Sequence, residues 1–207
     1  MGAAQTIAGS LPAVGSFVLT GGRTASLVYE HLARATIDWS GIEIFFSDER
    51  CVPPTDDDSN YKMVKTKLLD AAEPGEVFRI HGEDPPDVAA DAYNDNLAAV
   101  ADGFDLMMVG MGAEGHICAL FPNSTALTSS RLSVAVDRPD GMKGITMTPR
   151  ALLMAKKIYI VERGTEKADA VRRAMNGDEP ASTVPVRVLA EHPDVTFLID
   201  EPAASLL

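Results

Sequence analysis

The chain has 207 residues, of which 46% are hydrophobic and 23% are charged, and these proportions are ordinary for a globular protein. The length allows a sizeable core, and we interpret 1–207 as a single domain because no internal repeat or long linker interrupts it. The formal net charge of −12 argues against nucleic acid as the main partner, since phosphate backbones need clustered Lys and Arg, but it leaves room for an anionic small molecule in a locally cationic cleft.

Strand-like and helix-like segments alternate along the chain. The strand-like runs are, in order, 16–20, 42–46, 77–80, 105–110, 132–136, 158–161 and 195–199. The helix-like segments are 24–34, 59–69, 87–101 and 165–175. Several strand runs are continuously apolar, as expected for strands that are covered on both faces. The alternation predicts an α/β fold with an open, mostly parallel sheet and helices on both faces, similar to a modified Rossmann fold.

The first strand-to-helix connection contains Gly21, Gly22, Arg23 and Thr24. The two glycines allow backbone N–H groups to approach an anion closely, and the helix N-terminus adds a favourable partial charge. No Gly-Lys-Ser/Thr follows, so the signal is weaker than that of a P-loop. An anion site and a simple tight turn are both open readings of this loop.

Three consecutive charged residues, Asp48, Glu49 and Arg50, follow the strand at 42–46. Such a run is usually a solvated turn. Arg50, however, offers a planar fork that suits a phosphate or a carboxylate, and Asp48 is placed to align it. The acidic stretch at 56–58 lacks the alternate spacing and the bidentate Glu of a calcium loop.

The strand at 105–110 runs into a glycine-rich loop that holds Glu114 and His116. The glycines within 110–115 imitate the G-x-G-x-x-G dinucleotide fingerprint. That fingerprint needs a helix at its third glycine, and Pro122 follows within seven residues, so we do not expect a dinucleotide site. Histidine is the side chain best suited to moving protons near neutral pH, which makes this loop the predicted centre of the chemistry.

Lys167 follows the strand at 158–161 and is predicted to lie in the first turn of a helix. A cation there opposes the helix macrodipole, and a residue that breaks a local rule is a modest hint of function. The alternative reading is a surface lysine.

Cofactors, metals and membrane segments are not expected. The two cysteines, Cys51 and Cys118, have no paired spacing and suggest a reducing compartment, while the four histidines are scattered without metal-ligand spacing. No apolar run approaches the ~18 residues of a membrane span, and no basic leader is visible. We therefore expect a cytoplasmic protein.

These loops, in their order and spacing, resemble the 6-phosphogluconolactonase family. The resemblance covers nearly the whole chain from about residue 16 onward and includes the segments LTGGRTA, FFSDERCVPPTDDDSNYKM, DLMMVGMGAEGHICALFPNS and GTEKADAV. The DER-x-VP…SN and GxGxxGH…LFP blocks are its most specific parts. The related glucosamine-6-phosphate deaminases share the sheet and a similar histidine loop, but usually have Asp-Glu-Tyr where this chain has Asp48-Glu49-Arg50.

The resemblance implies hydrolysis of 6-phospho-D-glucono-1,5-lactone to 6-phosphogluconate without a cofactor, by a monomer or small homo-oligomer. His116 is then the general base that activates water, and Glu114 orients its imidazole. A catalytic role for Cys118 is not expected, because the family typically has alanine there. The residues implied to bind the sugar phosphate are Gly21, Gly22, Arg23, Thr24, Asp48, Arg50 and Lys167.

The chain departs from the family pattern at several positions. Arg23 replaces a serine, Glu114 an aspartate and Ile117 a threonine. Gly144 stands where members often have arginine, and Lys143 is a candidate to compensate for its loss. The family helix and strand that commonly precede the first loop are also expected to be missing.

Two other functions stay open at this point. A deaminase or aldose–ketose isomerase would need a carboxylate that moves a proton between C1 and C2 of the sugar, and Asp48 is a candidate. A sugar-phosphate-sensing module would keep the pocket without the chemistry, a reading that the departures from the family pattern raise.

Overall fold

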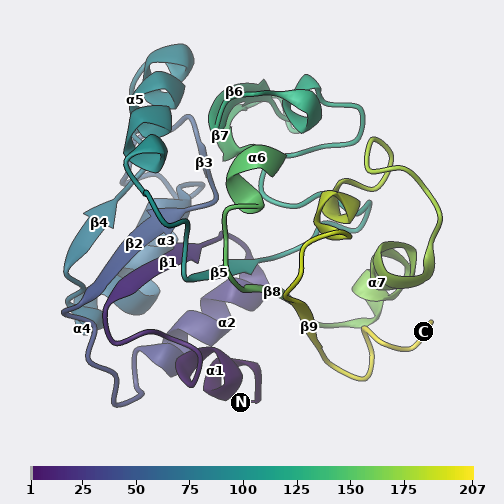
Figure 1. The fold of residues 1–207 in the computed structure, drawn as a ribbon, viewed down its shortest axis with the longest axis horizontal. Helices are drawn as coiled ribbons and strands as arrows, with labels where there is room; N and C mark the ends of the chain where they lie inside the picture. Colours follow the sequence, from purple (N-terminus) through teal and green to yellow (C-terminus); the bar gives the residue numbers. More distant parts are fainter. Residues whose placement is uncertain (1) are drawn as a thin grey trace.

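The computed structural model describes residues 2–207, and its main feature is a six-stranded sheet with the strand order β4-β2-β1-β5-β8-β9 (Figure 1). Each neighbouring pair in this sheet is parallel. Its strands are β1 (Gly15–Leu19), β2 (Ile42–Phe46), β4 (Glu76–Phe78), β5 (Leu106–Val109), β8 (Ile158–Glu162) and β9 (Val195–Ile199). The prediction of an α/β fold with a mostly parallel sheet flanked by helices is therefore confirmed.

The central strands are buried along their whole length because their side chains are apolar on both faces. The four residues of β5 have no solvent exposure, and β8 is buried from Ile158 to Glu162. Continuous apolar runs of this kind are typical of parallel strands covered on both sides.

The helices connect and cover the strands. They are α1 (Gly2–Ala8), α2 (Arg23–Leu32), α3 (Asn60–Val64), α4 (Asp70–Ala72), α5 (Pro86–Ala98), α6 (Pro149–Leu152) and α7 (Ala168–Asn176). A π-helical turn, Lys65–Leu69, joins α3 to α4, so the predicted helix at 59–69 is continued by a wider turn. Helix α1 packs against α2 and was not predicted. No helix within residues 2–207 is long and apolar enough to cross a membrane.

A second, three-stranded antiparallel sheet was not predicted. It has the order β3-β7-β6 and consists of β3 (Asp48–Arg50), β7 (Lys143–Met147) and β6 (Ser133–Asp137). The run at 132–136 was correctly predicted as a strand, but it belongs to this sheet and not to the parallel one. Helix α5 packs against β6 and β7, which buries one face of the small sheet (Figure 1).

Strands β2, β1, β5 and β8 are consecutive in the parallel sheet, so their carboxyl ends lie along one edge. From β1 the chain continues to β2 on one side of β1, whereas from β5 it continues to β8 on the opposite side of β5. The boundary between β1 and β5 is therefore a topological switch point. Open α/β sheets bind their ligands at such points. All four predicted site loops follow these four strands.

Candidate active site

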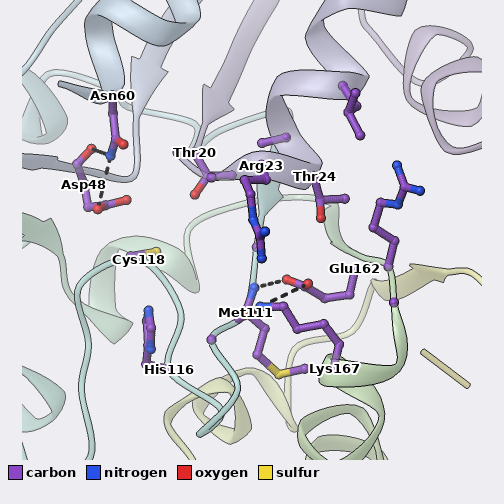
Figure 2. A pocket seen from close by; sticks show the side chains of 18 of the residues that line it. Thr20, Arg23, Thr24, Asp48, Asn60, Met111, His116, Cys118, Glu162 and Lys167 are labelled. Atoms are coloured by element: carbon purple, nitrogen blue, oxygen red, sulfur yellow. Dashed lines mark hydrogen bonds and ion pairs between the residues drawn. The ribbon is translucent and has the colours of Figure 1, made fainter. Parts of the chain in front are cut away.

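A cavity of about 690 Å³ lies where these four loops meet (Figure 2). His116 lines the cavity, whereas Glu114 reaches it only through its contact with His116. Asn60, Arg138, Glu162 and Arg163 also line it, although the sequence did not identify them as site residues. The residues predicted to bind the sugar phosphate all line it: Gly21, Gly22, Arg23, Thr24, Asp48, Arg50 and Lys167.

The first loop presents the N-terminus of α2 to the cavity. Gly22 is the N-cap residue and has φ 101° and ψ 163°, a backbone conformation that a residue with a Cβ rarely adopts. No side chain among residues 2–207 caps the helix, and the first N–H groups of a helix lack intrahelical partners. The uncapped end of α2 is therefore a site where an anion can accept backbone hydrogen bonds.

Two buried tyrosines fix the ends of β1 and β2. The Tyr29 hydroxyl donates to the Thr20 carbonyl at 2.8 Å and accepts from the Thr20 N–H at 2.9 Å. Tyr93 makes the same pair of bonds with the backbone of Phe46, at 2.7 and 2.9 Å. Burial raises the pKa of both hydroxyls, so each stays protonated and able to donate. The loops that follow β1 and β2 thus start from fixed positions.

The charged run after β2 is strand β3 and not a solvated turn. Asp48 and Glu49 are buried, with 5% and 2% exposure, because β3 pairs with β7. Alternation along the strand sends their side chains in different directions. Asp48 lines the cavity, and Glu49 is enclosed by the start of α3.

Asp48 does not align Arg50, which corrects that prediction. Its carboxylate accepts from the Ser47 hydroxyl at 3.0 Å and from the Asn60 amide at 3.3 Å (Figure 2). The Arg50 guanidinium instead donates to the backbone carbonyl of Asp58. Asn60 is the residue that holds Asp48; in the sequence it is marked by its place directly after the N-cap Ser59 and by the SN of the DER-x-VP…SN block.

Glu49 anchors the start of α3. Its carboxylate accepts from the backbone N–H groups of Arg50, Asn60 and Tyr61 at 2.8, 2.7 and 2.7 Å, and from the Ser59 hydroxyl at 2.9 Å. Burial raises its pKa, although these four hydrogen bonds act in the opposite direction. Glu49 thereby fixes Asn60, and through Asn60 it fixes Asp48 in the cavity.

We expect Glu49→Gln to destabilise the protein by about 2–4 kcal/mol, because an amide NH₂ would face N–H donors and leave buried donors without an acceptor. The free energy of unfolding from urea denaturation measures this loss. Glu43→Gln is the matched control, since Glu43 is exposed on β2, and it is expected to change stability by less than ~0.5 kcal/mol. Equal stability of the Glu49 and Glu43 variants would contradict the anchoring role.

His116 and Glu114 form a hydrogen-bonded pair. His116 Nδ1 lies 2.8 Å from Glu114 Oε1, and the imidazole packs on the Phe121 ring with centroids 4.7 Å apart. Burial acts to raise the pKa of Glu114, but its own backbone N–H, His116 and Lys167 together lower it. An ionised Glu114 accepts the proton on Nδ1, which leaves Nε2 of a neutral imidazole free to accept a proton.

The glycine-rich loop closes on itself and forms no helix. The Gly112 N–H donates to the His116 carbonyl at 2.8 Å, and Met111 and Ile117 form a β-bridge. A Cβ at position 112 would lie 2.1 Å from His116 Nδ1, so only glycine allows the imidazole its observed place. The dinucleotide-like spacing therefore serves the packing of the histidine.

Lys167 lies in a 3₁₀ turn, Thr165–Lys167, that precedes α7. Its ammonium donates to the Met111 carbonyl and lies 3.4 Å from Glu162 Oε2, while Glu162 accepts from the Met111 N–H (Figure 2). Burial raises the pKa of Glu162, against the opposing influence of Met111 and Lys167. Glu162 and Lys167 together hold the Met111 peptide at the base of the histidine loop. The strand predicted at 158–161 ended one residue before Glu162, so the sequence did not indicate that this carboxylate belongs to the buried end of β8.

The cavity differs in charge from the whole chain. Its cationic side chains outnumber its carboxylates, although the chain has a net charge of −12. The cations are Arg23, Arg50, Arg138, Arg163 and Lys167, and the carboxylates are Asp48, Glu162 and Glu166. A locally cationic cleft in an acidic protein favours a small anionic ligand.

Cys118 lines the cavity with its thiol buried. Burial, followed by the charge of Asp48, raises the pKa of the Cys118 thiol, which disfavours the reactive thiolate. Within residues 2–207, no group of three or more His, Cys, Asp or Glu side chains is placed to hold a metal ion.

Comparisons with known sequences identify related proteins. The chain matches the family described as glucosamine-6-phosphate isomerases/6-phosphogluconolactonase over residues 4–197. A 6-phosphogluconolactonase of Treponema pallidum is 37% identical over 181 residues, which cover 81% of this chain and 74% of the relative. A 6-phosphogluconolactonase of Mycobacterium tuberculosis is 36% identical over 209 residues, which cover 92% of this chain and 84% of the relative.

Solved structures give the same result. A 6-phosphogluconolactonase of Shewanella baltica superimposes with a TM-score of 0.86 at 29% identity, covering 96% of this chain and 90% of the other. A monomeric glucosamine-6-phosphate deaminase superimposes with a TM-score of 0.88 at 23% identity, covering 99% of this chain and 94% of the other. At this identity the likeness shows only that the two proteins share a fold. The chain therefore belongs to the glucosamine-6-phosphate isomerase/6-phosphogluconolactonase family.

Proposed function

We propose that this protein hydrolyses 6-phospho-D-glucono-1,5-lactone to 6-phosphogluconate. The observation that carries the proposal is the His116–Glu114 pair, 2.8 Å apart, at the edge of a cationic cavity. The relatives that are 36% and 37% identical are named 6-phosphogluconolactonases, which supports the same reaction for this chain.

The phosphate is bound at the uncapped N-terminus of α2. The backbone N–H groups after Gly21 and Gly22 and the Thr24 hydroxyl supply hydrogen bonds, and the cations around them supply charge. Arg50 also lines the cavity, on β3 beside Gly144, and adds positive charge there.

His116 acts as the general base at the other end of the ligand. Nε2 takes a proton from water as the water oxygen attacks C1 of the lactone, and the C1–ring oxygen bond then breaks. The proton passes from His116 to the ring oxygen, which becomes a hydroxyl group. C1 is then the carbon of a carboxylic acid, which ionises. Glu114 stabilises the imidazolium that forms between these steps.

Asp48 favours a deaminase as the second candidate. It is a buried carboxylate that lines the cavity and has no ion-pair partner among residues 2–207, as a proton shuttle between C1 and C2 requires. The two reactions differ in their products, because deamination of glucosamine 6-phosphate releases ammonium.

The test is to follow freshly generated 6-phosphogluconolactone with and without the purified protein, and to measure ammonium release from glucosamine 6-phosphate in parallel. We expect accelerated lactone opening and no ammonium. Ammonium release without lactone opening would favour the deaminase, and 6-phosphogluconate binding without either reaction would favour a sensing module. The cytoplasmic location and the oligomeric state stay predictions.

A further inference from the structure

Arg138 lines the active-site cavity and has no role in the function proposed so far. It follows β6 directly, and its side chain is only 11% exposed. Nε and Nη2 donate to Asp140 Oδ2 at 3.1 and 2.9 Å, and Arg138 is the main cause of the lowered pKa of Asp140. Asp140 thus occupies one edge of the guanidinium, while Nη1 makes no hydrogen bond to any residue of the described range 2–207 and is available to a ligand.

Arg138 occupies the space beside Gly144 where a side chain of β7 would otherwise stand. A Cβ at position 144 would lie 3.1 Å from Arg138 Cδ. Lys143, the candidate that the sequence suggested as a replacement for a cation at position 144, points elsewhere. It pairs with Asp137 at 2.8 Å, is 58% exposed and does not line the cavity. The cation therefore comes from the end of β6, and the glycine on β7 makes room for it.

The guanidinium lies at the histidine end of the cavity. Its carbon is 5.6 Å from the centre of the Phe121 ring, and the imidazole of His116 packs on the same ring with centroids 4.7 Å apart. Figure 2 shows His116 well apart from Thr24, which belongs to the phosphate-binding end. Arg138 therefore lies on the His116 side of the cavity.

We propose that Arg138 binds the C1 end of the ligand: the carbonyl oxygen of the lactone and then the carboxylate of 6-phosphogluconate. This inference rests on the proposed function. Hydrolysis places negative charge on the C1 oxygens, first in the tetrahedral intermediate and then in the ionised product. A guanidinium held in place by Asp140 and Phe121 is preorganised to stabilise that charge.

Calorimetric titration with two stable ligands tests this proposal. One is 6-phosphogluconate, and the other is D-glucitol 6-phosphate, which keeps the phosphate and hydroxyl groups but has CH₂OH in place of the carboxylate. The wild type is expected to bind 6-phosphogluconate about tenfold or more tightly. Arg138→Met is expected to lose this preference while binding D-glucitol 6-phosphate within about twofold of the wild type, and Arg138→Lys is expected to keep part of it.

Lys143→Met is the matched control, because it removes a neighbouring cation that lies outside the cavity, and it should keep the full preference. A preference that survives in Arg138→Met would overturn the proposal. If Arg138→Met lost affinity equally for both ligands, the proposal would also be overturned, because a purely structural role of Arg138 in the turn with Asp140 gives that result. If the wild type bound neither ligand, the proposed function itself would be contradicted. This outcome differs from one in which only the assignment of Arg138 fails, because the wild type then still binds the ligands.

Discussion

Replacing His116 by alanine is expected to lower kcat for lactone hydrolysis by about 10²- to 10⁴-fold, the usual contribution of a general base. KM should change little, because Thr24 at the start of α2, which is assigned to the phosphate, lies well apart from His116 (Figure 2). The expectation rests on geometry: His116 lines the cavity, and Glu114 holds Nδ1 at 2.8 Å, which directs Nε2 to act as the base.

The measurement is the initial rate of hydrolysis of freshly generated lactone, from which the spontaneous rate is subtracted. His81→Ala is the control, because His81 is half-exposed and lies outside the cavity, and it should keep the wild-type rate. If the His116 variant retains the wild-type kcat, the base must be another group. An unchanged kcat with a raised KM would move His116 from catalysis to binding.

The parallel sheet could be predicted because each of its central strands is an apolar run followed by a turn signal. The strand at 42–46 was predicted with the observed bounds of β2, and the run at 195–199 with those of β9. Strand β3 could not be recognised, since three charged residues in a row are typical of exposed loops. Its burial depends on pairing with β7 and on the start of α3, which are contacts between distant parts of the chain.

The distinction between local sequence signals and contacts of distant segments also applies to the site. Its four loops could be located because glycines and charges follow strands that are neighbours in the sheet. Asn60, Glu162 and Arg138 were missed because their roles depend on what they face. The Arg138 side chain lies against Gly144, and the Val136↔Gly144 pairing that brings the two strands together is not revealed by a single sequence.

The glycine at position 112 provides the sharpest test of whether the place of His116 controls the rate. A Cβ there would lie 2.1 Å from Nδ1 and 2.2 Å from Cε1 of His116, and 2.9 Å from Glu114 Oε2. Gly112 is not among the residues with positive φ, so the backbone accepts alanine without strain. The added methyl group must therefore displace the imidazole and leave the fold intact.

We expect Gly112→Ala to lower kcat by about 10²-fold, since a displacement of ~1 Å in a catalytic group costs about that much. Gly110→Ala is the matched control on the same loop: its Cβ would meet Glu162 Oε1 at 3.4 Å, an ordinary contact, and the loss should be far smaller. Thermal unfolding of both variants separates loss of activity from loss of folded protein. A Gly112 variant with full activity would mean that the position of His116 does not set the rate, and the assignment of the base would fail together with it.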